Sequence, residues 1–229
     1  AFTGSNATAV GSGAADAATD ATNLTAVGKS ALGACIGGLE NTAVGYAAGA
    51  AITTGDYNTA LGSLALDGSN VDAYGNTAIG RMALSNVCVN HNTGVGYNTL
   101  QAFTGSDATA VGSGAMDAAT SAGYSTAVGM SALGAVIDGV SNTAVGVSSM
   151  GLLTDTHYNT AMGHGSGYSC DGTSNVYLGY NAGFYATTAD HCIAIGRGAL
   201  EATSGANATG NYNVAIGSYA LDATTTGAN

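Results

Sequence analysis

The sequence predicts an all-β chain folded as a parallel β-solenoid (a β-roll) of about 13 rungs, each of about 17 residues. Two observations carry this prediction. A pentapeptide, clearest as NTAVG at residues 41–45, returns from one end of the chain to the other, and the 229 residues include 37 Gly but no Pro. A fixed short period is the signature of a solenoid. Without proline, every residue can donate a ladder hydrogen bond.

Each copy of the pentapeptide ends in a glycine, which we take as position 0 of its rung. Eleven of the twelve intervals between these glycines are 16 to 18 residues, and the last is 21. We expect this glycine to occupy a corner with positive φ, or a place where two backbones approach closely. The motif glycines are Gly11, Gly28, Gly45, Gly62, Gly80, Gly96, Gly112, Gly129, Gly146, Gly163, Gly179, Gly196 and Gly217.

Positions −3 to −1 are predicted to form a strand. Position −1 is Val, Ile, Leu or Met in every copy, and position −3 is Thr in ten copies and Val or Ile in the others. Because alternate residues of a strand share a face, we expect both positions to point into the core. Position −2, Ala in eleven copies, would then face outward, where another surface comes close. The interface predicted in this way consists of Ala9, Ala26, Ala43, Ala60, Ala78, Ala110, Ala127, Ala144 and Ala161.

The strand is followed by a glycine corner and a second short segment. That segment runs to position +4, which is Leu or Met in nine copies, and position −4 before the strand is Asn in eight. Asn tolerates left-handed turns, and stacked Asn side chains can hydrogen-bond from rung to rung. No linker divides the chain, so we predict a single repeat domain, 1–229. Neither end carries a recognisable cap, which favours a piece of a longer fibre or a unit that stacks end to end.

Two copies, Asn213–Gly217 (NVAIG) and Cys192–Gly196 (CIAIG), resemble the N-S-V-A-I-G repeat in the heads of YadA-like trimeric autotransporter adhesins. The NTAVG copies are also similar to repeats in the tail fibres of some bacteriophages. The adhesin resemblance implies a left-handed parallel β-roll and three chains side by side, exposed on a cell surface to bind host matrix or cells. It covers all thirteen rungs, but only five or six positions of each.

We therefore expect an extracellular structural or adhesive fibre segment, on a virion or a microbial cell surface, without enzymatic activity. Its expected partners are further copies of the chain, as a trimer, and a host-surface glycan or protein. The alternative is an extracellular filament of solenoid subunits stacked end to end. An ice-binding protein is less favoured, because ice binding needs Thr to point outward and these Thr residues are predicted to point inward.

Composition excludes two classes of partner. The net charge is −11, with only three basic residues, whereas nucleic-acid binding depends on Lys and Arg that neutralise phosphates. No run of 18 apolar residues occurs, so membrane insertion is not expected.

The chemically reactive residues form no recognisable site, and we predict no catalytic, metal or cofactor site. The histidines are spread over three rung positions, and the cysteines have no metal-binding spacing. Free buried thiols are favoured, with bonds between chains or within a local loop left open. Aspartates recur at +5, but at least three rungs apart, roughly 14 Å or more at strand spacing, whereas glycan cleavage needs two carboxylates within about 10 Å. These cysteines, histidines and aspartates are Cys35, Cys88, Cys170, Cys192, His91, His157, His164, His191, Asp16, Asp67, Asp117 and Asp222.

Long side chains gather at position +1. We expect this column to be an exposed edge, and it could also contact glycans or protein. Its members are Lys29, Tyr46, Arg81, Tyr97, Met130, His164, Tyr180 and Arg197.

Overall fold

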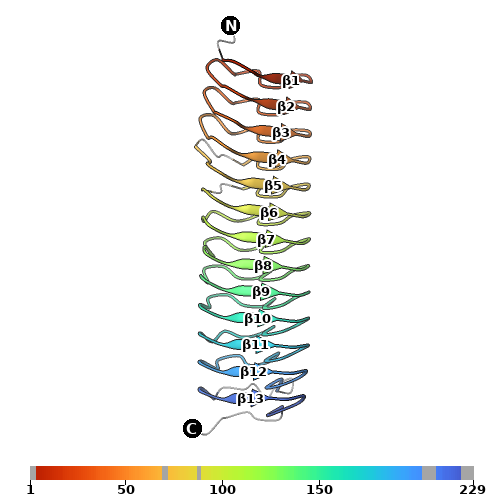
Figure 1. The fold of residues 1–229 in the computed structure, drawn as a ribbon, viewed down its shortest axis with the longest axis vertical. Coiled ribbons are helices and arrows are strands. Elements are labelled where there is room, and N and C mark those ends of the chain that lie inside the picture. The colour runs from red at the N-terminus through yellow and green to blue at the C-terminus, as the bar shows by residue number, and fades with distance from the viewer. Residues whose placement is uncertain (1–3, 69–71, 87–88, 203–209, 223–229) are drawn as a thin grey trace. The chain divides into compact units, whose positions relative to one another are not determined.

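A computed structural model confirms the all-β parallel solenoid (Figure 1). It describes residues 4–68, 72–86, 89–202 and 210–222. Each rung contributes one strand of three residues, and the described residues include no helix. The structure divides into two compact units, Ala1–Ser113 and Gly114–Asn229, which are described one at a time.

Within each unit, strands from successive rungs pair in parallel and in register, so that Thr42 pairs with Thr25 and Thr59. The first unit contains β1 (Thr8–Val10), β2 (Thr25–Val27), β3 (Thr42–Val44), β4 (Thr59–Leu61), β5 (Thr77–Ile79), β6 (Thr93–Val95) and β7 (Thr109–Val111). The second contains β8 (Thr126–Val128), β9 (Thr143–Val145), β10 (Thr160–Met162), β11 (Val176–Leu178), β12 (Ile193–Ile195) and β13 (Val214–Ile216).

Hydrogen bonds between rungs continue well beyond the strands. The glycine amide donates to the −1 carbonyl of the preceding rung, as from Gly45 to Val27 at 2.8 Å. On the opposite wall, the +4 amide donates to the +3 carbonyl of the next rung, as from Leu32 to Ala48 at 2.9 Å. The strands are therefore the regular part of a ladder that also includes the turns.

The corners of each rung use left-handed backbone. Non-glycine residues with positive φ recur at −5, +2 and +4, as at Glu40 (φ 54°) and Ala47 (φ 52°). Gly45 has φ 140°, and a Cβ placed on it would lie 2.5 Å from the carbonyl oxygen of Gly62 in the next rung. Both reasons predicted for the motif glycine, positive φ and close backbone approach, are confirmed.

The predicted orientation of the strand is wrong, because its two faces are exchanged. Position −2 points inward, and eight of the nine alanines assigned to an outer interface are buried: Ala26, Ala43, Ala60, Ala78, Ala110, Ala127, Ala144 and Ala161. Ala9 is exposed because it belongs to the first rung, where Ala7, Ala9 and Ala14 help to line a cavity of about 660 Å³. The −1 residues are on the outside, with Val10 57% and Met162 52% exposed.

The thinness of the rung explains this orientation. Gly94 occupies position −2 of its rung, and a Cβ built there would lie 3.3 Å from Cγ of Leu84 and 3.6 Å from Cδ1 of Leu100. Both leucines occupy position +4 and are fully buried. Position −2 therefore faces position +4 across the core, and an alanine fills the space that a leucine or methionine leaves. A valine at −2 would overpack it.

A further column of core residues was not predicted. Position +7 is buried in the described rungs, and its occupants include Cys35, Ile52, Phe103 and Leu153. The column has no constant residue type, because its volume varies with the neighbouring +4 position. In the third rung, for example, +4 is Gly49, and a Cβ there would lie 3.2 Å from Cδ1 of Ile52.

The stacked asparagines at −4 confirm the predicted ladder at the second corner. Oδ1 of Asn41 accepts hydrogen bonds from the backbone amide of Asn58 at 2.9 Å and from its Nδ2 at 3.0 Å. Nδ2 of Asn41 donates to the carbonyl of Gly55 at 2.7 Å. The same pattern recurs in the second unit, where Oδ1 of Asn142 accepts from the Asn159 amide. Because these residues are buried, each satisfied amide avoids a desolvation cost of about 1–3 kcal/mol.

Candidate functional site

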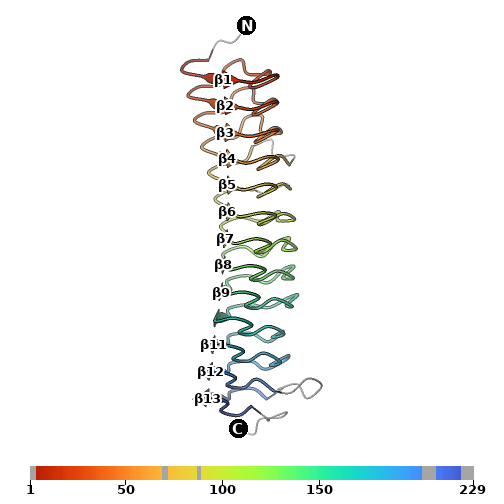
Figure 2. The ribbon, with the colours of Figure 1, turned by 90° about the vertical axis from the view of Figure 1, so that its right-hand side faces the viewer.

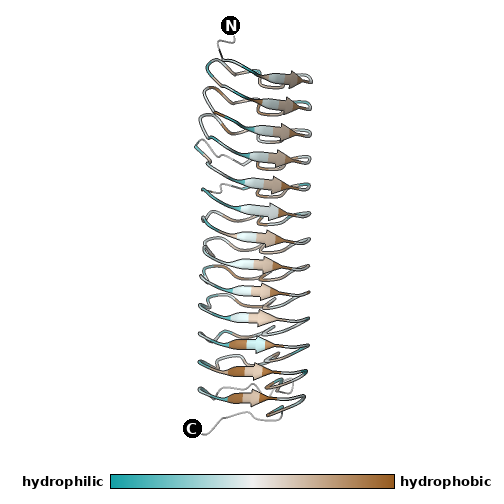
Figure 3. Ribbon diagram, viewed as in Figure 1, coloured by the Kyte–Doolittle hydropathy of each residue, from teal (hydrophilic) through white to brown (hydrophobic). Residues whose placement is uncertain are grey.

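The exchange of faces creates an exposed apolar surface, which we call the outer strand face. It consists of the side chains at −3 and −1, and in each unit the strands lie along one side of the rungs (Figure 2). None of these side chains is charged. Toward the C-terminal strands the face becomes wholly aliphatic, because β11, β12 and β13 begin with Val or Ile in place of Thr (Figure 3).

Position +1 forms an edge beside this face, which we call the cation corner. All eight of the long +1 side chains are exposed, as predicted. In the second unit, the ring of His164 stacks on Tyr180 with centroids 5.4 Å apart. The guanidinium of Arg197 lies 5.6 Å from the Tyr180 ring and 5.5 Å from the ring of Tyr219 at +2. These contacts join four successive rungs.

The first unit repeats the arrangement with its own cations. Nζ of Lys29 lies 6.0 Å from the Tyr46 ring, and the Arg81 guanidinium lies 5.6 Å from the Tyr97 ring. Nη1 of Arg81 also donates to the Tyr97 hydroxyl at 3.4 Å. All three basic residues of the chain thus occupy one rung position, and each rests on an aromatic ring.

The opposite edge of the strand, positions −8 to −5, carries carboxylates and rings, and we call it the carboxylate corner. Here Tyr57, Tyr74 and His91 form an edge-to-face series with centroids 5.2 and 5.4 Å apart. Oδ1 of Asp56 accepts from the Leu39 amide of the preceding rung at 2.7 Å, and Oδ1 of Asp190 accepts from the Thr173 amide at 2.7 Å.

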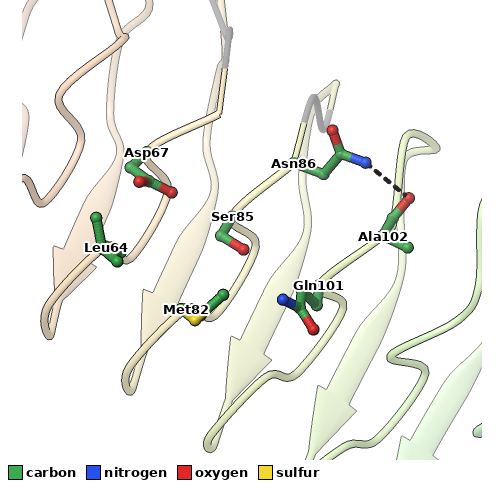
Figure 4. Close-up of a pocket in the computed structure, with 7 residues that line it drawn as sticks. All are labelled: Leu64, Asp67, Met82, Ser85, Asn86, Gln101 and Ala102. Carbon is green, nitrogen blue, oxygen red and sulfur yellow. Dashed lines mark hydrogen bonds between the residues drawn. The ribbon is translucent and has the colours of Figure 1, made fainter.

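A shallow pocket of about 450 Å³ opens between the loops that follow β4, β5 and β6 (Figure 4). Asp67 supplies the one carboxylate among the residues that line it. Burial raises the pKa of the Asp67 carboxyl, and it raises the pKa of Asp117 at the same rung position. A lone carboxyl lacks the second acid group that glycoside hydrolysis requires.

The cysteines that the structure describes, Cys35, Cys170 and Cys192, are buried, as predicted, and form no disulfide within the chain. Cys88 lies outside the described residues. Sγ of Cys170 lies 3.1 Å from the hydroxyl of Tyr177, the residue that takes the place of the −2 alanine in β11. Burial raises the pKa of the Cys170 thiol to about 11 and holds the pKa of Tyr177 well above its ordinary value.

The raised pKa of Cys170 predicts a loss of stability at alkaline pH. Below its ordinary value of 9.0 the thiol is protonated in both states, but between pH 9 and about 11 only the unfolded chain releases the proton. The free energy of unfolding should fall by about 2–3 kcal/mol across this window, at about 1.4 kcal/mol for each pH unit. Urea unfolding at several pH values should show a steeper decline for the wild type than for Cys170→Ala. Equal slopes would contradict the prediction.

The histidines do not come together as a site. His91, His157, His164 and His191 each lie beside an aromatic ring, and His157 is also 3.3 Å from the carboxylate of Asp155. Among the described residues, no group of three His, Cys, Asp or Glu side chains could hold a metal ion.

Nor do the described residues contain a helix long and apolar enough to cross a membrane. Comparison with protein-family models, with curated proteins and with solved structures finds no match. What the geometry establishes is therefore the architecture, a parallel β-solenoid with an exposed apolar strand face between a cation corner and a carboxylate corner.

Proposed function

We propose that this chain is a segment of an extracellular structural or adhesive fibre, on a virion or a microbial surface, and that it has no enzymatic activity. The observation that carries the proposal is the outer strand face. It exposes large aliphatic side chains such as Val10, Leu61 and Ile216, in register along each unit. Contiguous exposed apolar surface of this kind marks an association site. The resemblance of the pentapeptide to adhesin and tail-fibre repeats supports the extracellular setting.

The occupant of this face in our proposal is another copy of the chain, in a trimer whose parallel copies turn their outer strand faces toward one another. An identical copy offers the same repeat spacing, so that the apolar residues of every rung meet at one height. The face is also free of charge, although the chain carries a net charge of −11. This replaces the alanine interface predicted from the sequence, because those alanines are already buried within the rungs.

Leu61→Glu tests the assembly. Leu61 is 45% exposed and lies in the middle of the first unit, so the change should leave the rung folded. In a trimer, however, three carboxylates would be buried near the axis, and dissociation to monomers is expected. Analytical ultracentrifugation or light scattering measures the mass. Leu152→Glu is the matched control, because Leu152 is 52% exposed but lies at +6, outside the strand face and outside both corners.

The wild-type mass is itself decisive. A stable monomer at micromolar concentration would contradict the proposed trimer. If the Leu61→Glu variant has the same oligomeric mass as the wild type, the interface lies elsewhere. Electron microscopy separates a fibre segment of fixed length from the alternative, a filament of subunits stacked end to end, because the filament has one indefinite repeat.

A second candidate, ice binding, is favoured by one specific finding. The prediction disfavoured it because Thr was expected to point inward, yet Thr42, Thr59 and Thr77 lie on the outer strand face in register. Leu61 and Met162 interrupt the regular surface that ice would contact, and β11 to β13 have no Thr at −3. Thermal hysteresis of the purified protein measures this activity. A freezing-point gap in a monomeric protein would favour ice binding, and its absence would exclude it.

A further inference from the structure

The charges of this chain are sorted by rung position. All three basic residues lie at +1, whereas all fourteen acidic residues lie either at −8 to −5 or at +5. Nine of the acids belong to the carboxylate corner. The strand therefore runs from an edge that carries carboxylates to an edge that carries every cation.

The cations do not use these carboxylates within their own copy. Among the residues described, Lys29, Arg81 and Arg197 form no ion pair with an acidic side chain. The reason is geometric, because positions −5 and +1 lie beyond opposite ends of the three-residue strand, a separation of between about 10 and 20 Å. That exceeds the Debye length of about 8 Å at physiological ionic strength, so the two corners of one copy hardly attract each other.

The bonding of the two corners differs. Carboxylates at −8 to −5 already have structural roles, since Asp56 and Asp190 accept backbone amides of the preceding rung. Within the described part of the chain, the charged groups of the three cations contact aromatic rings and a tyrosine hydroxyl, and their side chains remain exposed. Their positive charge is thus available to a partner that brings its own anions.

We propose that the cation corner of one copy docks against the carboxylate corner of the next copy in the assembly. The inference rests on the proposed trimer. When parallel copies turn their outer strand faces toward a common axis, rotation brings the leading edge of each copy to the trailing edge of its neighbour. Every rung that carries a cation also carries a carboxylate at the other corner: Lys29 with Asp20, Arg81 with Asp72, and Arg197 with Asp190. In-register copies therefore place opposite charges at the same height.

The size of the outer strand face supports participation of the corners. Three residues per strand and a strand spacing of about 4.8 Å give about 340 Å² for seven strands and about 290 Å² for six. Stable interfaces bury about 800 Å² on each partner. The corners lie beside the face and offer further area, and their tyrosines are a residue type enriched at interfaces.

Charge reversal in the complete chain tests the pairing. One variant changes Lys29, Arg81 and Arg197 to Glu, a second changes Asp20, Asp72 and Asp190 to Lys, and a third combines all six changes. Each triple variant should raise the concentration for half-dissociation at least about tenfold, because repulsion replaces attraction at three heights. The combined variant should recover most of the loss. Circular dichroism of each variant verifies the fold, and the wild-type assembly should weaken as salt rises.

The outcomes are distinguishable. A monomeric wild type would contradict the proposed assembly itself. If the wild type is an oligomer and both triple variants associate with the same affinity as the wild type, only the pairing of corners is contradicted. Failure of the combined variant to recover association also contradicts it. Binding of the wild type to an immobilised acidic polysaccharide such as alginate, lost in the Glu triple variant while oligomer mass is unchanged, would assign the cation corner to anionic glycans instead.

Discussion

Gly45→Ala is expected to cost the solenoid about 4 kcal/mol or more, an effect at the extreme of single substitutions. The new Cβ would lie 2.5 Å from the Gly62 carbonyl oxygen and 2.6 Å from its carbon. Neither atom can move freely, because the Gly62 amide is itself bonded to the Val44 carbonyl at 2.8 Å. The φ of 140° adds backbone strain of about 1–3 kcal/mol. Urea unfolding followed by circular dichroism measures the loss.

Two glycines of the same chain separate the clash from the strain. Gly217 is a motif glycine with φ 123°, but a Cβ there would meet nothing within 4 Å, so Gly217→Ala should show the strain alone. Gly37 has neither a close neighbour nor a positive φ, and Gly37→Ala should change stability by no more than about 0.5 kcal/mol. Equal losses for Gly45→Ala and Gly37→Ala would refute the close approach of successive rungs.

Tyr177→Ala is expected to cost about 3–5 kcal/mol, because it removes the largest fully buried side chain of the core. The neighbouring +4 positions leave space for this ring. Position +4 holds Gly167 and Gly183 on either side of it, where nine other rungs have Leu or Met. A Cβ on Gly167 would lie 2.8 Å from Cδ2 of Tyr177, and one on Gly183 would overlap the ring.

Two leucine side chains at position +4 should be able to replace the ring of Tyr177. In Tyr177→Ala, the added changes Gly167→Leu and Gly183→Leu should restore most of the lost stability, because Leu84 and Leu100 occupy the same left-handed position at φ 51° and 53°. With Tyr177 retained, the same two leucines should be strongly destabilising. Thermal and urea unfolding of this set yields a coupling energy between the sites. If the effects simply add, the ring does not fill the space of the two leucines.

The sequence repeat predicted the architecture because the repeated residues are those that the stacked backbone requires. A glycine every 16 to 18 residues is required by the close approach of successive rungs, and the buried Asn ladder follows from the same spacing. Both features depend on the main chain and on one side-chain type, so pattern alone is sufficient to find them.

The candidate surface could not be predicted in the same way. A strand of three residues has two faces that differ by one position, and the larger residues are normally assigned to the core. Here Val44 lies outside and Ala43 inside. Ala43 faces position +4 across a narrow rung, where a Cβ built on Gly49 would lie 3.7 Å from the Cβ of Ala43. The distance across the core is a property of the folded coil, and no local pattern contains it.

The hydrogen bonds between rungs join residues about 17 positions apart throughout most of the chain. Divided by 229 residues, this separation gives a relative contact order of about 0.07, which is typical of helical bundles rather than of sandwiches and barrels. The number of residues between paired positions of successive rungs is nearly the same along the chain, so each pairing closes a loop of similar, short length. Ordering can therefore nucleate at any pair of neighbouring coils and spread in both directions, and this all-β protein should fold quickly.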